Sequence, residues 1–255
     1  MKQLVKLDYL RDETEVYQSS EYIRRLYWDS SPFIQHLFYD LLDTALSLVS
    51  KMPSDSSVLD VGIAEGPFLP TLSKYFNQVV GVDINYDHIK VAQSITNCAS
   101  NRLQNSVLAV ADGMALPFRT NRYDIVFCLE TLEHVTSIHN VLEEISRVLK
   151  KGGILISSVP IEIGLPILIR QIAGKMLGFP RDSYSSREII DAIIGRNLER
   201  RRKRENKMHS HRFFSWRSVL KELENTSLIL DSMVFTPCPG IRFFSTNVTF
   251  RAIKG

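Results

Sequence analysis

The sequence predicts a doubly wound α/β fold with a mostly parallel sheet of seven strands. Two observations carry this prediction. From residue 57 onward, short apolar runs alternate with segments of helical periodicity, which is typical of parallel strands joined by covering helices. Near the C-terminus two apolar runs follow each other across a Pro- and Gly-containing turn, so they have to pair as an antiparallel hairpin.

Each element is expected from its own pattern. The strands are short runs rich in Val, Ile, Leu and Phe, expected over residues 58–61, 79–83, 107–110, 123–128, 154–159, 228–235 and 241–253. The helices carry apolar residues three and four positions apart, expected over residues 66–76, 86–99, 138–149 and 215–224. Lys151 and Gly152 suit the end of the third helix, and Ser215 suits the start of the last.

Residues 1–54 are expected to form a helical cap ahead of an α/β domain of residues 55–255. Residues from about Thr14 to Met52 are expected to form two helices, the first indicated by tyrosine, isoleucine and leucine recurring at helical spacing over 22–27. A second helix is expected from Pro32 to Met52, because proline is tolerated in the first turn.

Residues 160–210 interrupt the alternation and are expected to form a helical lid inserted in the domain. Within them, residues 196–207 hold seven basic and two acidic side chains. Such a run can attract an anionic acceptor, an anionic membrane surface or RNA. It is equally typical of a solvated helix, and the sequence leaves these alternatives open.

Composition narrows the class of protein. A net charge of +3 is too small to indicate nucleic-acid binding by itself. Three cysteines, far apart and without a CxxC pair, give no disulfide framework and no structural zinc site, so no metal is expected. Cys128, inside an apolar run, is expected to be a small core residue. No uncharged run approaches the ~20 residues that span a bilayer, and a cytoplasmic location is the default expectation.

Glycines follow the first predicted strand, in the segment Asp60-Val61-Gly62-Ile63-Ala64-Glu65-Gly66. Glycine there lets the backbone turn tightly and approach a ligand, and the next helix N-terminus can hold a carboxylate or a phosphate. The second predicted strand ends at Asp83, which can accept hydrogen bonds from both hydroxyls of a ribose. The alternative is that Asp83 caps the following helix, a role for which Asn85 competes.

The third and fourth predicted strands also end in polar residues. Asp112 can accept a hydrogen bond from the exocyclic amine of an adenine, while Gly113 and Met114 offer a backbone N–H and an apolar face. The alternative is an ordinary solvated Asp-Gly turn. Glu130 and His134 follow the fourth strand, in Leu-Glu-Thr-Leu-Glu-His-Val.

Taken together, the segments 58–66, 81–83, 111–118 and 123–135 resemble the class I S-adenosylmethionine-dependent methyltransferases, in the broad group of small-molecule and quinone-biosynthesis O-methyltransferases. The similarity covers about residues 55–160 and resumes near 209–230. It implies a Rossmann-like methyltransferase fold, S-adenosylmethionine as the cofactor, and S-adenosylhomocysteine as the product.

The resemblance also implies roles for individual residues. The methionine half of the cofactor would be lined by Asp60, Gly62, Ala64 and Gly66, with the Leu129 backbone near its amino group. The ribose and adenine would be held by Asp83, Ile84, Asp112, Gly113 and Met114.

Two residues depart from the family's glycine loop. Ala64 replaces its middle glycine, which is tolerable if φ is negative there. Glu65 adds a negative charge, which is expected either to face solvent or to meet the substrate.

Methyl transfer requires alignment of the acceptor for in-line attack, and a hydroxyl acceptor also needs a base. His134 is the first candidate for that base, because a neutral imidazole accepts a proton near neutral pH; the alternative is a structural wall of the pocket. His209 and His211 come next, since His-x-His-x-Phe stretches in the family lie beside the acceptor, and their alternative is to cap the helix near 215.

The expected activity is methyl transfer to a small-molecule or a lipid- or glycan-linked acceptor, on oxygen. RNA methylation is a weaker alternative, because the chain has no Asp/Asn-Pro-Pro-Tyr after the fourth strand. A nicotinamide dehydrogenase would need G-x-G-x-x-G, which is absent. A non-catalytic cofactor-binding protein remains a further alternative, and neither the acceptor nor the oligomeric state follows from the sequence.

Overall fold

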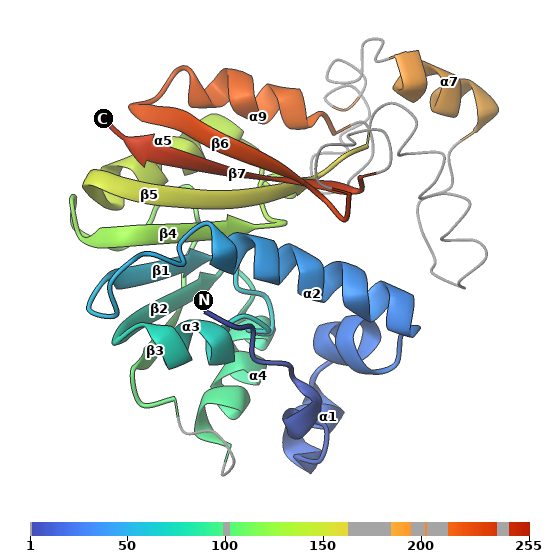
Figure 1. The fold of residues 1–255 in the computed structure, drawn as a ribbon, viewed down its shortest axis with the longest axis vertical. Helices are drawn as coiled ribbons and strands as arrows, with labels where there is room; N and C mark the ends of the chain where they lie inside the picture. Colours follow the sequence, from blue (N-terminus) through green and yellow to red (C-terminus); the bar gives the residue numbers. More distant parts are fainter. Residues whose placement is uncertain (1, 99–102, 163–184, 195–201, 203–213, 239–244) are drawn as a thin grey trace.

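A computed structural model describes residues 2–98, 103–162, 185–194, 202, 214–238 and 245–255. Seven strands form one sheet: β1 (Ser57–Val61), β2 (Gln78–Asp83), β3 (Ser106–Val110), β4 (Tyr123–Leu129), β5 (Leu149–Pro160), β6 (Leu228–Thr236) and β7 (Asn247–Lys254). The helical segments are η1 (Asp8–Leu10), α1 (Thr14–Ser19), η2 (Arg24–Trp28), α2 (Pro32–Ser47), α3 (Leu69–Tyr75), α4 (Tyr86–Asn97), α5 (Ile138–Val148), α7 (Ser186–Ile194) and α9 (Trp216–Leu223). Figure 1 shows their arrangement.

The strand order is β3-β2-β1-β4-β5-β7-β6. The first five strands are parallel, whereas β7 runs antiparallel to both β5 and β6. The predicted mostly parallel sheet and its C-terminal hairpin are therefore confirmed, with β7 as the one reversed strand. The winding changes direction between β1 and β4, and in open α/β sheets ligands bind outside the carboxyl ends of the strands at such a point.

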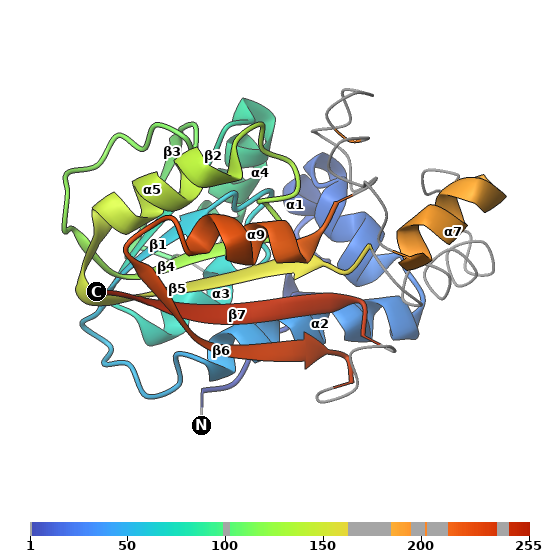
Figure 2. The same cartoon turned by 90° about the horizontal axis from the view of Figure 1, so that it is seen from above.

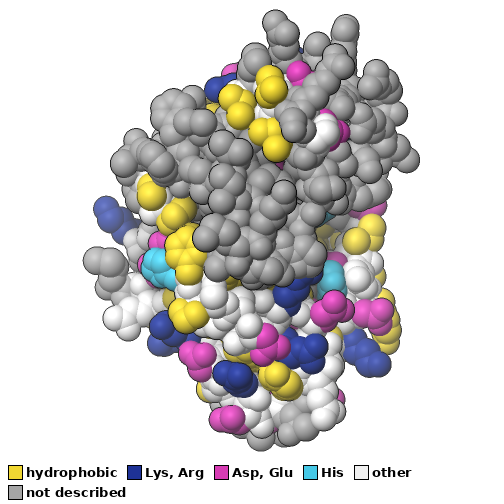
Figure 3. Space-filling view, turned by 90° about the vertical axis from the view of Figure 1, so that its right-hand side faces the viewer, with side chains coloured by type: hydrophobic (Ala, Val, Ile, Leu, Met, Phe, Trp, Pro, Cys, Tyr) yellow, Lys and Arg dark blue, Asp and Glu magenta, His cyan; other side chains and the backbone are white. Residues whose placement is uncertain are grey.

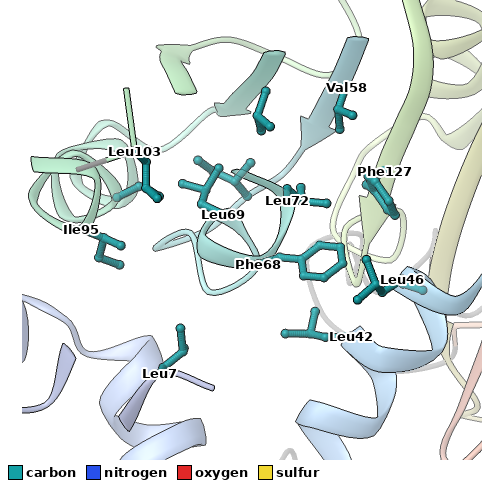
Figure 4. Close-up of a cluster of buried hydrophobic side chains, with 14 of the residues drawn as sticks. Leu7, Leu42, Leu46, Val58, Phe68, Leu69, Leu72, Ile95, Leu103 and Phe127 are labelled. Atoms are coloured by element: carbon teal, nitrogen blue, oxygen red, sulfur yellow. The ribbon is translucent and has the colours of Figure 1, made fainter. Parts of the chain in front are cut away.

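Helices cover both faces of the sheet, with α5 and α9 on one side and α2 and α3 on the other (Figure 2). One apolar cluster joins α5 and α9 to the sheet, and the other joins α2, α3, α4 and the N-terminal residues to its opposite face. In the second cluster, Leu42 and Leu46 of α2 lie near Phe68 and Phe127 (Figure 4), whose rings meet edge to face with centroids 5.3 Å apart. The N-terminal segment therefore shares a core with the sheet.

Several helix boundaries differ from the predictions for local reasons. The helix expected from residue 66 begins only at Leu69, because Gly66 has φ +79° and the chain turns before it can enter a helix. The first of the two helices expected from about Thr14 is divided into α1 and a separate π-helical turn, η2. Pro32 opens α2 as predicted, with Ser31 Oγ accepting from the Ile34 N–H at 3.4 Å.

The last helix, α9, begins at Trp216 after Ser215, although the Ser215 hydroxyl makes no capping hydrogen bond. Most of the expected lid at 160–210 lies outside the described residues, so the division into a cap of 1–54 and a domain of 55–255 with a lid stays a prediction. No helix in the described ranges is both long and apolar enough to cross a bilayer.

Candidate functional site

A cavity of about 510 Å³ lies at the carboxyl ends of β1, β2, β3 and β4. Its size falls within the range of small-molecule sites. The structure brings ten of the twelve predicted site residues into its walls: Asp60, Gly62, Ala64, Asp83, Ile84, Asp112, Gly113, Met114, Leu129 and His134. The other two are Gly66, which does not line the cavity, and His211, which lies outside the described residues together with His209.

Gly62 turns the chain at the end of β1, where φ is +77° and the Gly62 N–H donates to the Val82 carbonyl at 2.8 Å. A Cβ at this position would lie 2.2 Å from Thr131 Oγ1, so the loop passes close to the segment after β4. Gly66 serves packing, because its Cβ would meet Leu69 at 2.6 Å and Ala92 at 3.1 Å, between α3 and α4. Its expected place beside a ligand is therefore not observed.

The condition under which alanine would be tolerated at position 64, a negative φ, is not met, because Ala64 has φ +49°. A left-handed conformation costs an L-residue about 1–2 kcal/mol. The Ala64 N–H donates to Asp83 Oδ2 at 2.9 Å, so the neighbouring strand holds the loop in this conformation.

Asp83 binds the loop and the start of α4 rather than capping that helix. Its Oδ1 accepts from the Asn85 N–H at 2.8 Å and lies 3.3 Å from His88 Nδ1. The capping bond belongs to Asn85, whose Oδ1 accepts from the Asp87 N–H at 2.9 Å. Burial opposes ionisation of Asp83, but the bonds from His88, Asn85 and Ala64 outweigh burial and hold its pKa below the usual value. A carboxylate oxygen accepts more than one hydrogen bond, so Asp83 can still accept from a ligand hydroxyl.

Asp60 is buried at the end of β1, with 4% of its surface exposed. Burial, reinforced by the charge of Asp83, raises the pKa of Asp60 to about 7. A cation in this cavity would favour the ionised form, since opposite charges attract strongly where water is excluded.

The raised pKa of Asp60 predicts a pH-dependent stability. Between the unfolded value of 3.8 and about 7, the folded chain keeps a proton that the unfolded chain has released. The free energy of unfolding should therefore fall by roughly 2–3 kcal/mol from pH 5 to pH 8 through this group, and Asp60→Asn should remove that part of the slope. Urea unfolding at several pH values measures it, with Asp124→Asn as a control, because Asp124 has a lowered pKa. Parallel profiles for wild type and Asp60→Asn would contradict the assignment.

Asp112 makes a local turn and also faces the cavity. Its Oδ1 accepts from the Met114 N–H at 2.8 Å, as the alternative of an Asp-Gly turn predicts. Since Asp112, Gly113 and Met114 all line the cavity, that turn presents them to a ligand.

Glu130 is a cavity residue that the sequence placed at this sheet edge without assigning it a role. It has φ +50°, and its carboxylate accepts from Ser158 Oγ at 3.0 Å and Asn247 Nδ2 at 2.7 Å. These bonds from β5 and β7 fix the carboxylate at the cavity wall.

The N-terminal segment supplies an apolar wall that no sequence motif indicated: Tyr22, Tyr27, Phe38, Leu41 and Leu42. Glu65 explains how this wall is held. Both expectations for Glu65, solvent or substrate, are wrong, because its side chain is buried with 4% exposure and its oxygens accept three backbone N–H groups from residues 21–23.

His134 lines the cavity after β4 with 43% of its side chain exposed. Its backbone N–H donates to the Thr131 carbonyl at 2.9 Å, and its Nε2 lies 3.9 Å from Glu133 Oε1. The exposed ring is thus accessible to a molecule in the cavity.

Charge gives the cavity a preference for cations. Four of the described lining residues carry carboxylates, and none is Lys or Arg.

Within the parts of the chain that the structure describes, no three His, Cys, Asp or Glu side chains are placed to hold a metal ion. The thiol of Cys128 is buried in the core as predicted, and burial raises its pKa.

Of the basic run at 196–207, the structure describes Arg202 alone. Arg202 is buried, donates to the Glu133 carbonyl and stacks over Phe214, with the guanidinium 5.0 Å from the ring centroid. This arginine faces the segment beside His134, so it is not part of a solvated surface. On the face seen in Figure 3, the acidic and basic side chains of described residues are interspersed.

The part of the chain that forms most of the cavity is similar to known methyltransferases. Residues 59–157 match the family model described as "Methyltransferase domain". The chain is 31% identical over 149 residues to the ubiquinone biosynthesis O-methyltransferase of Chromobacterium violaceum, covering 56% of this chain and 60% of that protein. In the curated relatives the match spans 32% to 61% of their length, or about half.

Solved structures share the fold. An S-adenosylmethionine-dependent methyltransferase from Aquifex aeolicus aligns with a TM-score of 0.58 at 18% identity, over 96% of this chain and 99% of that one. The geranyl diphosphate C-methyltransferase of Streptomyces coelicolor aligns with a TM-score of 0.60 at 14% identity, over 87% of this chain and 79% of that one.

Proposed function

We propose, on the premise that residues 59–157 form a methyltransferase domain of the class I S-adenosylmethionine-dependent superfamily, that this chain transfers the methyl group of S-adenosylmethionine to a small-molecule acceptor. The observation that carries the proposal is the convergence of Asp60, Asp83 and Asp112, from the ends of three adjacent strands, on one cavity.

The cavity suits this cofactor by its charge and by the polar groups in its walls. S-adenosylmethionine carries a sulfonium and an ammonium group, and the walls hold carboxylates without Lys or Arg among the described lining residues. In the proposed complex, Asp83 accepts hydrogen bonds from the ribose, and the Asp112–Met114 turn holds the adenine. The pyrophosphate of NAD would meet the same carboxylates unfavourably.

When bound, the cofactor supplies an activated methyl group. The residues of this chain then have to align an acceptor and remove its proton. His134, with its exposed ring at the cavity wall, is the proposed base, and the apolar side chains of the N-terminal segment exclude water.

Replacing His134 by glutamine should lower kcat by about 100-fold, the contribution typical of a positioned base, and leave the affinity for S-adenosylhomocysteine within about twofold. The control is His139→Gln, because His139 lies 3.6 Å from Glu222 on α9 and does not line the cavity. The change in kcat is measured with an acceptor that the wild-type chain methylates, and the affinity for S-adenosylhomocysteine is measured by calorimetric titration. If His134→Gln and His139→Gln have the same kcat, His134 is not the base and only forms part of the cavity wall.

The acceptor is proposed to be a small, uncharged, apolar or aromatic molecule that is methylated on oxygen. Support comes from the aromatic and aliphatic wall of the N-terminal segment and from the carboxylates, which disfavour an anionic acceptor near the reacting atom. The C. violaceum relative is named for an O-methyltransferase, whereas the S. coelicolor structure is named for a C-methyltransferase. Analysis of the product formed from an acceptor that offers both an oxygen and a carbon atom distinguishes O-methylation from C-methylation.

We further propose that residues 1–54 and 160–210 together form the cap that selects the acceptor.

The test of the proposed function is calorimetric titration of the full chain with S-adenosylmethionine, S-adenosylhomocysteine and NAD. Binding of both adenosyl ligands and not NAD is expected. Failure of both adenosyl ligands to bind would refute the proposal. Binding without turnover of any apolar acceptor would instead favour a non-catalytic cofactor-binding protein.

A further inference from the structure

Glu65 makes an unusual set of contacts for a residue in a ligand-binding loop. Its Oε1 accepts the backbone N–H groups of Glu21 and Tyr22, and its Oε2 accepts that of Ile23, each at 2.8 Å. These N–H groups begin the helical stretch of residues 22–28, and the first N–H groups of a helix have no partner within it. Glu65 therefore satisfies them from 42 to 44 residues away along the chain. Hydrogen bonds to an ionised acceptor are about twice as strong as neutral ones.

The segment that Glu65 holds is a wall of the cavity. Tyr22 lies in it directly, and Tyr27 follows within η2. Tyr27 also packs on α2, with its ring centroid 5.1 Å from that of Tyr39 and 5.9 Å from that of Phe38. The position of these rings is therefore set by α2 on one side and by Glu65 on the other.

On its other side, Glu65 continues directly into the proposed cofactor loop. The preceding Ala64 lines the cavity in a left-handed conformation, and its N–H donates to Asp83 Oδ2. The same short stretch of chain thus bonds to the carboxylate proposed for the ribose and to the segment that carries Tyr22.

From these contacts we infer that Glu65 is a positioning residue, which docks residues 21–28 against the cavity and joins the acceptor-side wall to the cofactor-side loop. The inference rests on the proposed function for the identity of the two sides. It gives the negative charge in the glycine loop a role that touches neither ligand. Loss of the docking should loosen the wall and the Ala64–Asp83 contact together.

The experiment compares wild type, Glu65→Gln and Asp124→Asn as full-length chains. Asp124 is the matched control, because its carboxylate also accepts a backbone N–H, that of Ser57 at 2.8 Å, but at the amino ends of the strands. Amide hydrogen exchange is measured for residues 21–28, and the affinity for S-adenosylhomocysteine is measured by calorimetry. Thermal unfolding of all three chains shows whether each variant is folded at the temperature of measurement.

Glu65→Gln should speed exchange in residues 21–23 by about tenfold or more, because breaking even one hydrogen bond to a charged group has an effect of that size. It should also weaken S-adenosylhomocysteine binding by about three- to tenfold. Asp124→Asn should change neither the exchange rate at residues 21–23 nor this affinity, even where it lowers the stability of the chain by a similar amount. Unchanged exchange at 21–23 would overturn the docking role. Faster exchange with unchanged affinity would overturn the coupling of the two sides. Absence of binding to wild type would instead refute the proposed function, and the exchange result would still decide the docking role.

Discussion

Replacing Asp83 by alanine is expected to weaken S-adenosylhomocysteine binding by about 100-fold. A carboxylate that accepts from two ribose hydroxyls makes two charge-assisted hydrogen bonds, each worth about 1.5–3 kcal/mol, of which part is recovered by water. The substitution also leaves the Ala64 N–H without its acceptor, so the loop relaxes from its left-handed conformation. Calorimetric titration of the two proteins gives the ratio directly.

Two companion variants separate these contributions. Asp83→Asn keeps the size of the side chain but removes its charge, so it should lie between wild type and Asp83→Ala. Asp87→Ala is the control, because Asp87 is exposed in the first turn of α4, the helix that follows Asp83, and does not line the cavity. An Asp83→Ala chain that is folded and binds within threefold of wild type would show that this carboxylate does not hold the ribose.

The parts of the fold that the sequence predicted well are those whose pattern is local and strong. The helix expected at 138–149 is α5, because its apolar stripe faces a single sheet surface without interruption. Five strands were found within one residue of their expected bounds. The strand expected from residue 154 begins at Leu149, so Lys151 and Gly152, expected at the end of the preceding helix, belong to β5. The last strand, β7, begins at Asn247 within a run expected from residue 241, part of which lies outside the described residues. The start of α3 was missed because a left-handed glycine, not the apolar pattern, decides where the chain enters the helix.

The same distinction explains the site. Strand-end carboxylates such as Asp60 and Asp83 could be predicted to converge, because parallel topology places the ends of neighbouring strands together. The wall that contains Tyr22 could not, since it is placed by hydrogen bonds to Glu65 from a distant part of the chain. The one signal in the sequence was the departure of Glu65 from the family's loop, and periodicity offers no means of pairing it with residues 21–23.

Gly62→Ala is expected to be the most destabilising substitution by alanine in the loop. It should lower the free energy of unfolding by about 3 kcal/mol or more. The φ of +77° alone costs an alanine about 1–2 kcal/mol. The new Cβ would also lie 2.2 Å from Thr131 Oγ1 and 2.6 Å from its Cγ2, so either Thr131 or the loop would have to shift.

Gly152→Ala isolates the first of these costs. Gly152 has φ +74°, and no atom lies within 4 Å of the position of its Cβ, so this variant should lose only about 1–2 kcal/mol. The double variant Gly62→Ala/Thr131→Ala removes the two Thr131 atoms nearest the new methyl group and should regain about 1 kcal/mol or more over the sum of the single changes. Urea unfolding of these three variants and of the single variant Thr131→Ala measures these differences. If Gly62→Ala and Gly152→Ala lose the same stability, the loop after β1 does not pack closely against Thr131, and the close approach of the segments that follow β1 and β4 would be refuted.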